Sequence, residues 1–375
     1  MKIAVPKESA AGEFRVAASQ DIVKKLTDLG ISVVIQKEAG ITSEISDQMY
    51  QEAGAVSAPD FNATVDQADI ILKIQPPSAE EVKALPKGSC LVCLMNVRSD
   101  LTAAKAVAKA GVTCFAMELL PRISRAQNMD VLSSQSNLAG YKAVIDAIAA
   151  YKKAVPMMMT AAGMISPAQV LVLGAGVAGL QAIATAKRLG AAVTAFDVRP
   201  SVKEQVESLG AKFLETAKIE QAETTGGYAK ELDEQSKKNQ EEALLAIMPK
   251  TDIIITTALI PGKKAPLLIT EEMLKRMKSG SIVFDLAAEQ GGNCYGTLYG
   301  KTVTHYGTTI FGQSNAASQL SASASPLFAK NLYNFILPMI DREKISLNIN
   351  FEDEIYQAAC IAKNGQLLIE ESTHV

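Results

Sequence analysis

The stretch from Val170 to Arg199, VLVLGAGVAGLQAIATAKRLGAAVTAFDVR, constrains the fold of this chain more than any other. An apolar run enters a glycine-rich turn, and a helix-forming segment and a second apolar run follow, which predicts a strand, a turn, a helix and a strand. Gly174, Gly176 and Gly179 have the spacing G-x-G-x-x-G. In a dinucleotide-binding turn the first glycine permits the tight turn, the second admits a pyrophosphate against the backbone, and the third lets helix and strand pack closely.

Asp197 ends the second apolar run, and Arg199 follows it. A dinucleotide-binding fold places a carboxylate here to bind both hydroxyls of an adenosine ribose. Because a 2′-phosphate would meet that carboxylate, the motif favours NAD(H) over NADP(H), although Arg199 would weaken the preference. The alternative is a glycine turn that only packs a helix. The strand, the helix and the acid in their expected places argue against this alternative.

The length of 375 residues exceeds one small core, so we expect two domains. Apolar residues make up 48% of the chain and charged residues 21%, which is typical of globular proteins. Lys and Arg number 37 against 40 Asp and Glu, for a net charge of −3. This balance provides no positive field for nucleic acid or anionic lipid, so nucleic acid is not an expected partner.

No apolar run has the length of a membrane span, about 18 residues. The densest run, Pro156–Ile165, is short and is interrupted by Thr160 and Gly163. The N-terminal Met-Lys leads directly into the strand-like Ile3–Val5, which leaves no room for the apolar core of a signal peptide. We therefore expect a cytoplasmic protein.

Residues 1 to about 130 alternate helical stretches that end in glycine with short apolar strands, which predicts a parallel sheet covered by helices. The expected strands are Ile3–Val5, Ile31–Ile35, Ala68–Ile74, Cys90–Leu94 and Val112–Ala116, and the expected helices are Asp21–Leu29, with Ser19 as N-cap, and Leu101–Ala110. This stretch of the chain has no G-x-G-x-x-G of its own.

The second half predicts a further layer of the same kind. A long helix from about Ser136 to Ala154 connects the domains, and the later elements are strands at Lys212–Leu214, Asp252–Thr257, Ser281–Leu286 and Thr308–Gly312, a helix at Asn331–Ile340 and a terminal strand at Ile345–Phe351. We expect this terminal strand to pack back on the first domain. The predicted fold is α/β, with two Rossmann-like, doubly wound parallel-sheet domains (residues 1–133 with 314–375, and residues 134–313) and NAD(H) in a cleft between them.

The interval Glu220–Glu242 breaks the pattern, because it is highly charged and contains the pair Gly226-Gly227 followed by Tyr228. Long loops of this kind in compact folds are often lids. Composition alone leaves two alternatives open, a lid and a solvated helix.

The residues available for catalysis are few. The chain has two histidines, His305 in a strand-like segment and His374 at the C-terminal end, which argues against a histidine metal site, a Ser-His-Asp triad and a histidine acid. Cys90 and Cys93 lie inside the strand-like SCLVCL, so we expect buried thiols rather than a redox pair or half a zinc site. Oxidation of an alcohol or amine needs a base near the substrate, whereas hydride transfer between two nicotinamide rings needs mainly orientation and exclusion of water.

Four long motifs carry a family resemblance: PRISRAQNMDVLSSQSNLAGY (Pro121–Tyr141), GAGVAGLQAIATAKRLGA (Gly174–Ala191), TALIPGKKAP (Thr257–Pro266) and DLAAEQGGNC (Asp285–Cys294). In this order they closely resemble the NAD(H)-binding component, domain I, of proton-translocating nicotinamide nucleotide transhydrogenases. The same family contains alanine dehydrogenase. The resemblance covers nearly the whole chain, from KIAVPKE to the final strand.

Carried over position by position, the resemblance implies which residues hold the nucleotide. The set around the nicotinamide ring, where guanidinium, amide and hydroxyl groups would orient a carboxamide and a ribose, is Arg122, Gln127, Asp130 and Ser133, with Asp130 able to pair with Arg122. Gly227-Tyr228 would be the mobile loop that closes on the nucleotide, and Tyr228 joins this set as an expected catalytic residue. The full implied cofactor-binding set is Arg122, Ile123, Ser124, Gln127, Asp130, Ser133, Gly174, Ala175, Gly176, Val177, Gly179, Asp197, Val198, Arg199, Gly227, Tyr228, Gln240 and Leu259, with Leu259 near the ring and no metal ligand.

The resemblance implies a function as well as a site. NADH on this chain would pass a hydride directly to NADP⁺ on a separate NADP(H)-binding component, coupled to a transmembrane proton channel. The chain would be a soluble homodimeric subunit, associated peripherally with the cytoplasmic membrane through these partners.

Two alternatives remain. Arg15 in EFRVA and Lys73 in ADIILKIQPP match the substrate arginine and lysine of alanine dehydrogenase, but the catalytic histidine of that enzyme aligns with Asn96, and the enzyme lacks the RISRAQ loop. The third class is an NAD-binding module without a chemical role, which would have no lid and no exposed nicotinamide face.

Overall fold

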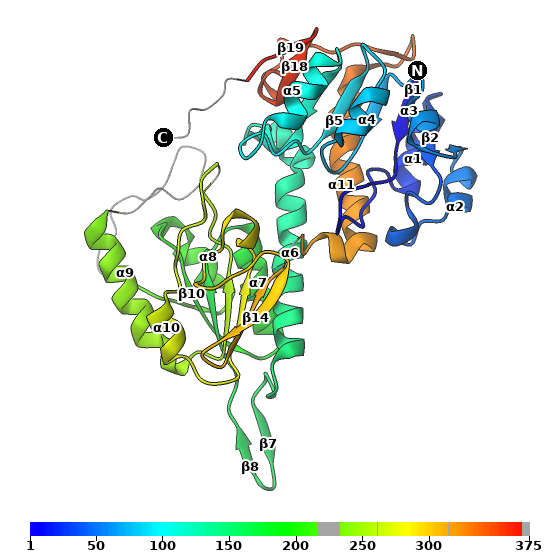
Figure 1. Cartoon of the computed structure of the whole chain (residues 1–375). Coiled ribbons are helices and arrows are strands. Elements are labelled where there is room, and N and C mark those ends of the chain that lie inside the picture. The colour runs from blue at the N-terminus through cyan, green and yellow to red at the C-terminus, as the bar shows by residue number, and fades with distance from the viewer. Residues whose placement is uncertain (216–232, 261, 314, 370–375) are drawn as a thin grey trace. The chain divides into compact units, whose positions relative to one another are not determined.

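The computed structural model describes residues 1–215, 233–260, 262–313 and 315–369 (Figure 1). The chain divides into two compact units: unit 1 comprises residues 1–135 and 317–375, and unit 2 comprises residues 136–316. Gly226, Gly227 and Tyr228, on which the predicted lid depends, lie outside the described residues. Within the described ranges, no helix is long and apolar enough to cross a membrane.

Unit 1 is built on an eight-stranded sheet with the order β19-β18-β6-β5-β4-β1-β2-β3. The strands are β1 (Lys2–Val5), β2 (Ser32–Gln36), β3 (Val56–Ala58), β4 (Ile70–Leu72), β5 (Cys90–Cys93), β6 (Thr113–Ala116), β18 (Cys360–Lys363) and β19 (Gln366–Leu367). The first six are parallel, and β18 joins β6 in antiparallel orientation. The helices are α1 (Gln20–Asp28), α2 (Asp47–Glu52), α3 (Phe61–Val65), α4 (Ala79–Ala84), α5 (Thr102–Lys109), α11 (Ser321–Ile336) and α12 (Glu354–Ala359).

Alternate side chains of the buried strands enter different cores. In β1, Ile3 and Val5 belong to the cluster that includes α1 and α11, whereas Ala4 belongs to the cluster that includes α5. Successive side chains of a strand point to opposite faces, so the apolar runs of this sheet are buried on both sides. Ser19 caps α1 as predicted, because its side chain accepts a hydrogen bond from the N–H of Ile22.

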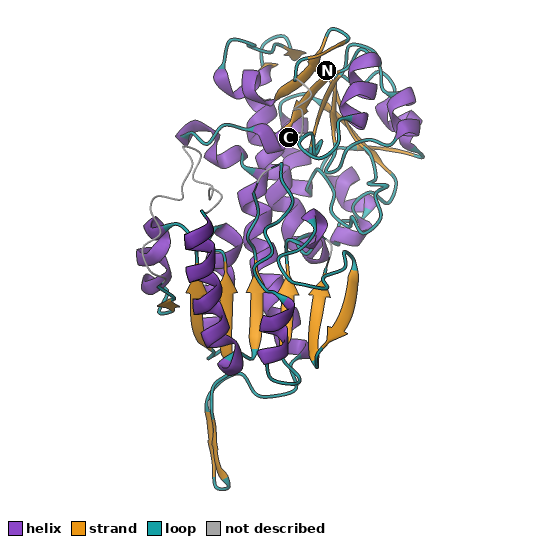
Figure 2. Ribbon diagram, turned by 60° about the vertical axis from the view of Figure 1, so that its left-hand side comes forward, coloured by secondary structure: helices purple, strands orange, loops and turns teal. Residues whose placement is uncertain are grey.

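Unit 2 contains a seven-stranded sheet with the order β11-β10-β9-β12-β13-β15-β14. Its strands are β9 (Gln169–Leu173), β10 (Ala192–Phe196), β11 (Lys212–Phe213), β12 (Ile253–Thr256), β13 (Ile282–Asp285), β14 (Lys301–His305) and β15 (Thr308–Gly312), and all are parallel except β14. The helices are α7 (Val177–Arg188), α8 (Lys203–Ser208), α9 (Glu234–Ile247) and α10 (Glu271–Arg276). Figure 2 shows these strands side by side with helices in front of them.

The predicted fold class, α/β with parallel-dominated Rossmann-like sheets, is confirmed. In each unit the strand that leads the parallel set lies inside the sheet: β1 lies between β2 and β4, and β9 lies between β10 and β12. The strand order therefore reverses beside β1 and beside β9. In doubly wound sheets, ligands bind at such a switch point, outside the carboxyl ends of the strands.

The connecting helix α6 runs over Val131–Ala150, and thus begins at Val131 rather than at Ser136. Asp130 explains the early start, because its Oδ1 accepts a hydrogen bond from the N–H of Ser133 at 2.9 Å, as an N-cap side chain does. Ser133, which precedes the predicted start of the helix, therefore lies in its first turn.

Two predictions for the C-terminal region were wrong in detail. The predicted helix Asn331–Ile340 is α11, which begins at Ser321 and ends at Ile336. The predicted strand Ile345–Phe351 contains only the short strand β17 (Ser346–Leu347), which pairs with β16 (Ile340–Asp341) and not with the large sheet. Its apolar side chains pack on the core of unit 1, but β18 is the strand that returns to the sheet.

The densest apolar run of the sequence forms a hairpin of strands β7 (Met158–Thr160) and β8 (Gly163–Ile165). Thr160 and Gly163, which interrupt the run, are paired residues at its turn. Figure 1 shows the hairpin as an arm that extends from the rest of unit 2. Its apolar side chains are exposed.

Candidate functional site

The glycine turn after β9 has a tightly packed region formed by Gly174 and Gly179. Gly174 has φ +96°, in the region that favours glycine, and a Cβ there would lie 2.6 Å from Oγ1 of Thr257. A Cβ on Gly179 would lie 1.8 Å from the carbonyl oxygen of Gly174. These two glycines are therefore required by the packing of strand, turn and helix.

Gly176 differs from its two neighbours, because a Cβ at this position would meet nothing within 4 Å. Gly176 is also the N-cap of α7 and makes no side-chain cap. The first N–H groups of a helix have no acceptor within the helix, and they favour an anion. The protein's own packing does not require glycine at this position, and the space beside the backbone suits a pyrophosphate.

Asp197 is buried and its carboxylate is fully engaged by the protein. Oδ1 accepts hydrogen bonds from the N–H and Nε of Arg199 at 2.8 and 2.9 Å. Oδ2 accepts from the N–H of Ala175 at 2.7 Å and from Nη2 of Arg199 at 2.8 Å. The bond to Ala175 connects Asp197 to the glycine turn. The sequence did not reveal that Arg199 and Ala175 would occupy this carboxylate, and ribose binding by Asp197 stays a prediction.

The segment after β12 adjoins the glycine turn. The hydroxyl of Thr257 donates to the carbonyl oxygen of Gly174 at 3.1 Å. Leu259, two residues further on, exposes 38% of its surface. The remaining predicted residues of unit 2 are Val177, exposed at the start of α7, Val198, half-buried after β10, and Gln240, buried on α9.

The RISRAQ segment of unit 1 forms a short 3-10 helix, Ser124–Met129. Ala126 and Met129 are buried in the core of unit 1, while Arg122 and Gln127 are exposed. The predicted residues Ile123 and Ser124 are half-buried and exposed, respectively. The buried pair thus fixes the segment on the core and leaves polar side chains at the surface.

Asp130 and Ser133 form a close local pair. Besides the backbone bond described above, the hydroxyl of Ser133 donates to Oδ2 of Asp130 at 2.5 Å. These two contacts are those of a helix cap, a role that the sequence pattern did not predict for Asp130. The pairing of Asp130 with Arg122 stays a prediction. Ser133 is thereby oriented by the start of α6.

Other residues hold this segment, and the sequence did not reveal them. Nδ2 of Asn331 and Nδ2 of Asn334, both on α11, donate to the carbonyl oxygen of Asn128 at 2.9 and 2.8 Å. Arg125 forms ion pairs with Asp353 at 2.9 Å and Glu354 at 3.1 Å. The partners are more than 200 positions away in sequence, and no local pattern identifies them.

Arg15 and Lys73, the residues that match alanine dehydrogenase, are buried among carboxylates of unit 1. Nε and Nη2 of Arg15 donate to both oxygens of Glu13 at 2.7 and 2.6 Å, and Nη1 donates to Gln135 at 2.8 Å. Nζ of Lys73 lies 3.3 Å from Glu8 and 3.6 Å from Glu81. Burial raises the pKa of the Glu8 carboxyl, and attraction to Lys73 partly offsets this rise.

Asn96, which the resemblance aligns with the catalytic histidine of alanine dehydrogenase, is exposed and has φ +53°. Glu118 holds the turn around it by accepting hydrogen bonds from the N–H groups of Met95 and Val97. Burial raises the pKa of the Glu118 carboxyl against the effect of these bonds. Asn is one of the few residues other than glycine that tolerate this left-handed conformation.

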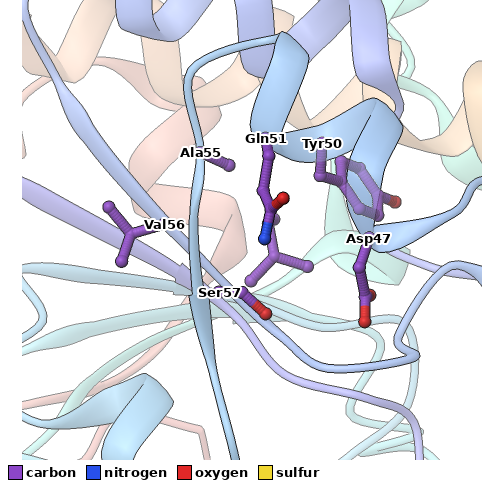
Figure 3. Close-up of a pocket in the computed structure, with 7 residues that line it drawn as sticks. Asp47, Tyr50, Gln51, Ala55, Val56 and Ser57 are labelled. Atoms are coloured by element: carbon purple, nitrogen blue, oxygen red, sulfur yellow. The ribbon is translucent and has the colours of Figure 1, made fainter.

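The described residues contain no cluster of three or more His, Cys, Asp and Glu side chains that could hold a metal ion. A shallow pocket beside β2 and α2 (Figure 3) has almost no volume that a water-sized molecule could enter, and its lining comprises Ile35, Asp47, Tyr50, Gln51, Ala55, Val56 and Ser57. Ligand pockets are typically about 300 to 1,000 Å³. The hydroxyl of Tyr50 already donates to Ala18, and none of the predicted site residues lines this pocket.

Comparison with known proteins assigns both halves of the chain to one family. The N-terminal domain of the alanine dehydrogenase/PNT family matches residues 4–139, and the C-terminal domain of this family matches residues 143–370. An NAD(P) transhydrogenase alpha-subunit chain from Rhodospirillum rubrum is 51% identical over 375 residues, which cover 98% of each chain.

Solved structures agree with this assignment. The crystal structure of transhydrogenase from Sinorhizobium meliloti matches with a TM-score of 0.89 and 48% identity, over 98% of this chain and 100% of that chain. An L-alanine dehydrogenase matches with a TM-score of 0.83 over 98% of this chain and 97% of that chain, but at 23% identity it shows the shared fold alone. The predicted resemblance is confirmed, and the chain belongs to the alanine dehydrogenase/PNT family.

Proposed function

We propose that this chain is the NAD(H)-binding subunit of a proton-translocating transhydrogenase. Bound NADH supplies a hydride that passes directly to NADP⁺ on a partner component. The main support from the structure is the open space at Gly176, beside the first N–H groups of α7, in a chain whose relatives include NAD(P) transhydrogenase alpha subunits. Within this proposal the glycine turn binds the pyrophosphate, and Asp197 binds the adenosine ribose.

The RISRAQ segment supports hydride transfer rather than amino-acid oxidation. Arg122 and Gln127 present polar groups at the surface, and Asp130 is already hydrogen-bonded to Ser133. In this proposal the segment orients the nicotinamide, and it needs no base because hydride transfer between two nicotinamide rings removes no proton from a substrate. Amino-acid oxidation would need a base, and Asn96 lies where alanine dehydrogenase has its histidine. The guanidinium of Arg15 is also occupied by Glu13, so a substrate carboxylate would have to displace it.

Isotope transfer tests the reaction. NADH deuterated at C4 is mixed with this chain, the NADP(H)-binding component and NADP⁺, and the product NADPH is analysed by mass spectrometry. Direct transfer carries the deuterium into the product without exchange with water. Alanine formation by the isolated chain from pyruvate, ammonia and NADH would favour the dehydrogenase alternative. A saturated mixture that transfers nothing would leave only a binding module.

Gln127→Asn tests the ring-end assignment, because the variant shortens the side chain by one methylene. We expect hydride transfer at saturating NADH to slow by about tenfold or more while NADH affinity changes little. Asn128→Ala is the matched control, since Asn128 is an exposed amide in the same helix and uses its main-chain oxygen to bind α11. Equal rates in the Gln127 variant and the wild type would remove this residue from the mechanism.

Asp197 bears on nucleotide choice. We propose that NADH binds better than NADPH because a 2′-phosphate would be buried beside this carboxylate. Asp197→Ala should weaken NADH binding and narrow the difference between the two nucleotides, as measured by calorimetry. Equal affinities of the wild type for both nucleotides would contradict the proposal.

We also propose that the subunit is a homodimer and reaches the membrane through its proton-channel partner. The hairpin β7–β8 supports a dimer: its Met157, Met158, Met159, Met164 and Ile165 are between 42 and 75% exposed. An isolated two-stranded hairpin is marginally stable in water, and a methionine-rich arm adapts well to a second copy of the chain.

Sedimentation equilibrium tests the dimer. Met159→Asp with Met164→Asp should yield monomers, whereas Leu298→Asp, at another exposed apolar position of unit 2, should leave the mass unchanged. A dimer that persists in the double variant would exclude the hairpin as the main contact.

A further inference from the structure

Asp285, the last residue of β13, is a buried carboxylate with five hydrogen bonds. Its exposed fraction is 0%. Oδ1 accepts from Oγ1 of Thr256 at 2.9 Å and from the N–H of Ala287 at 3.0 Å. Oδ2 accepts from the N–H groups of Asn293 and Cys294 at 2.8 and 3.1 Å and from the hydroxyl of Thr297 at 2.7 Å. Asp285 therefore joins the end of β12 to the loop that follows β13.

Asn293 extends this network to the segment after β12. Its side chain contacts the main chain of Ala258 twice: Oδ1 accepts from the N–H at 3.1 Å, and Nδ2 donates to the carbonyl oxygen at 2.9 Å. Nδ2 also donates to the carbonyl oxygen of Pro266 at 2.8 Å. Because Asn293 is fully buried, these bonds are shielded from water and hold Ala258 in one place.

Ala258 lies between two residues that concern the nucleotide. On one side, Thr257 donates to the carbonyl oxygen of Gly174 at 3.1 Å, so the segment is fastened to the glycine turn. On the other side is Leu259, the residue expected near the nicotinamide ring. The connection from Asp285 to the glycine turn is thus continuous through Asn293, Ala258 and Thr257.

We propose that Asp285 and Asn293 are positioning residues for the nicotinamide end of the bound dinucleotide. They fix the main chain of Ala258 relative to the glycine turn, and thereby the place at which Leu259 meets the ring. This inference rests on the proposed function, in which the chain binds NADH through that turn. Neither residue needs to touch the nucleotide.

A second buried carboxylate in unit 2 provides a matched control. Asp252 precedes β12 at the amino end of the same strand, is 6% exposed, and accepts hydrogen bonds from Gln169 N–H and Lys278 Nζ at 2.9 Å each. Its loss should lower stability as the loss of any buried, hydrogen-bonded carboxylate does. Asp252 lies at the amino end of β12, whereas Thr256 lies at the carboxyl end, so its loss should not affect binding of the nicotinamide end of the dinucleotide.

The experiment compares the binding of NADH and ADP-ribose, which lacks the nicotinamide, to the full chain by calorimetry. Asn293→Ala removes every side-chain bond to Ala258 and Pro266. Asp285→Asn replaces one carboxylate oxygen by an NH₂ group that faces N–H donors. In both variants we expect NADH affinity to fall about tenfold and ADP-ribose affinity to stay within about twofold of the wild type. Asp252→Asn should leave the ratio of the two affinities unchanged.

A purely structural role would give a different result. If NADH and ADP-ribose weaken equally in both variants, or if neither weakens, the positioning role is overturned. Circular dichroism identifies variants that do not fold, and Asn293→Ser then serves as a milder replacement with the same expected ratio. Failure of the wild type to bind NADH would instead overturn the proposed function. The two failures are therefore distinguishable.

Discussion

Unit 1 and unit 2 have the same central strand order but different groups at their switch points. In unit 1, Glu8 follows β1 and Lys73 follows β4, and their charged groups lie 3.3 Å apart and are buried. In unit 2, Gly174 follows β9 and Thr257 follows β12. Beside Gly176, two residues after Gly174, there is open space, because a Cβ at this position would meet no atom within 4 Å. Thus one switch point is filled by the protein's own charges, and the other leaves room for an anion.

The difference shows that the α/β framework does not by itself create a nucleotide site. Both sheets bring the carboxyl ends of two neighbouring strands together, as the strand order requires. In unit 2 the described residues at this point include Gly174 and Gly176, and Gly176 is the N-cap of a helix of twelve residues and has no side chain to cap it. Function therefore depends on the residues placed at the strand ends, not on the fold alone.

The largest expected effect that tests this comparison comes from Gly179→Ala. The new Cβ would lie 1.8 Å from the carbonyl oxygen of Gly174, so strand and helix must separate. We expect the free energy of unfolding of unit 2 to fall by more than about 3 kcal/mol, in the range of severe overpacking. Hydrogen exchange measured by mass spectrometry should show faster exchange in peptides of β9, β10 and α7. Native-like protection of these peptides would contradict the packing argument.

Lys73→Met should have the next largest effect, and in the other unit. Removing one partner of a buried ion pair typically costs about 3–5 kcal/mol, because Glu8 is then left buried without a counter-charge. We expect the amide hydrogens of β1 and β4 to exchange faster than in the wild type and the affinity for NADH to stay unchanged. Glu8→Gln combined with Lys73→Met should recover some of the loss, since it removes the unpaired carboxylate. A large fall in NADH affinity would show that the switch point of unit 1 serves the nucleotide after all.

Gly176→Ala separates binding from folding. Its φ of −77° is accessible to alanine and the Cβ meets no protein atom, so the free energy of unfolding should fall by about 1 kcal/mol or less, the typical cost of alanine at an N-cap. The methyl group would occupy space proposed for the pyrophosphate, and NADH should bind about tenfold or more weakly. Calorimetry together with denaturant unfolding measures both quantities. Unchanged NADH affinity would mean that the open space is not the phosphate site.

Features set by local sequence were predicted well. The glycine spacing, the cap at Ser19 and the alternating apolar strands depend on neighbouring residues, and the structure contains them. The N-cap at Asp130 had a local signal as well, an acid directly before an apolar helix, but the residue was predicted to be an ion-pair partner. Resemblance to a family, rather than periodicity, supplied the residues of the RISRAQ segment.

Features that depend on distant partners were not predicted. Arg199 is only two residues after Asp197, yet only the folded structure shows that its guanidinium donates hydrogen bonds to both oxygens of that carboxylate. The strand β18 is short and was missed, because its pairing with β6 comes from tertiary contact. Asp285 and Asn293 lie in a recognised motif, but the connection to Ala258 depends on two loops that meet at the strand ends.

The smallest expected effect is on the pH dependence of stability, and it compares one buried carboxyl group from each unit. In unit 1, burial raises the pKa of Glu118 above its ordinary value of 4.5. In unit 2, burial alone would raise the pKa of Asp252, but hydrogen bonds from Gln169 and Lys278 hold it below 3.8. The stabilising contribution of Glu118 is complete below about pH 4.5 and is lost as pH rises through its raised pKa, whereas that of Asp252 is present above about pH 3.8 and is lost as pH falls.

Glu118→Gln and Asp252→Asn should therefore change the pH dependence of stability in opposite directions. Relative to the wild type, Glu118→Gln should become more stable as pH rises from 4.5 towards neutrality, because the wild type must then bury a charge. Asp252→Asn should be less stable than the wild type above pH 3.8, and this difference in the free energy of unfolding should shrink as pH falls below 3.8, because protonation of Asp252 removes the same ion pair from the wild type. Urea unfolding at a series of pH values measures both slopes, and hydrogen exchange assigns each to its unit. Parallel slopes in the two variants would show that the pKa values of these two carboxyls are not shifted in opposite directions, which would contradict this difference between the units.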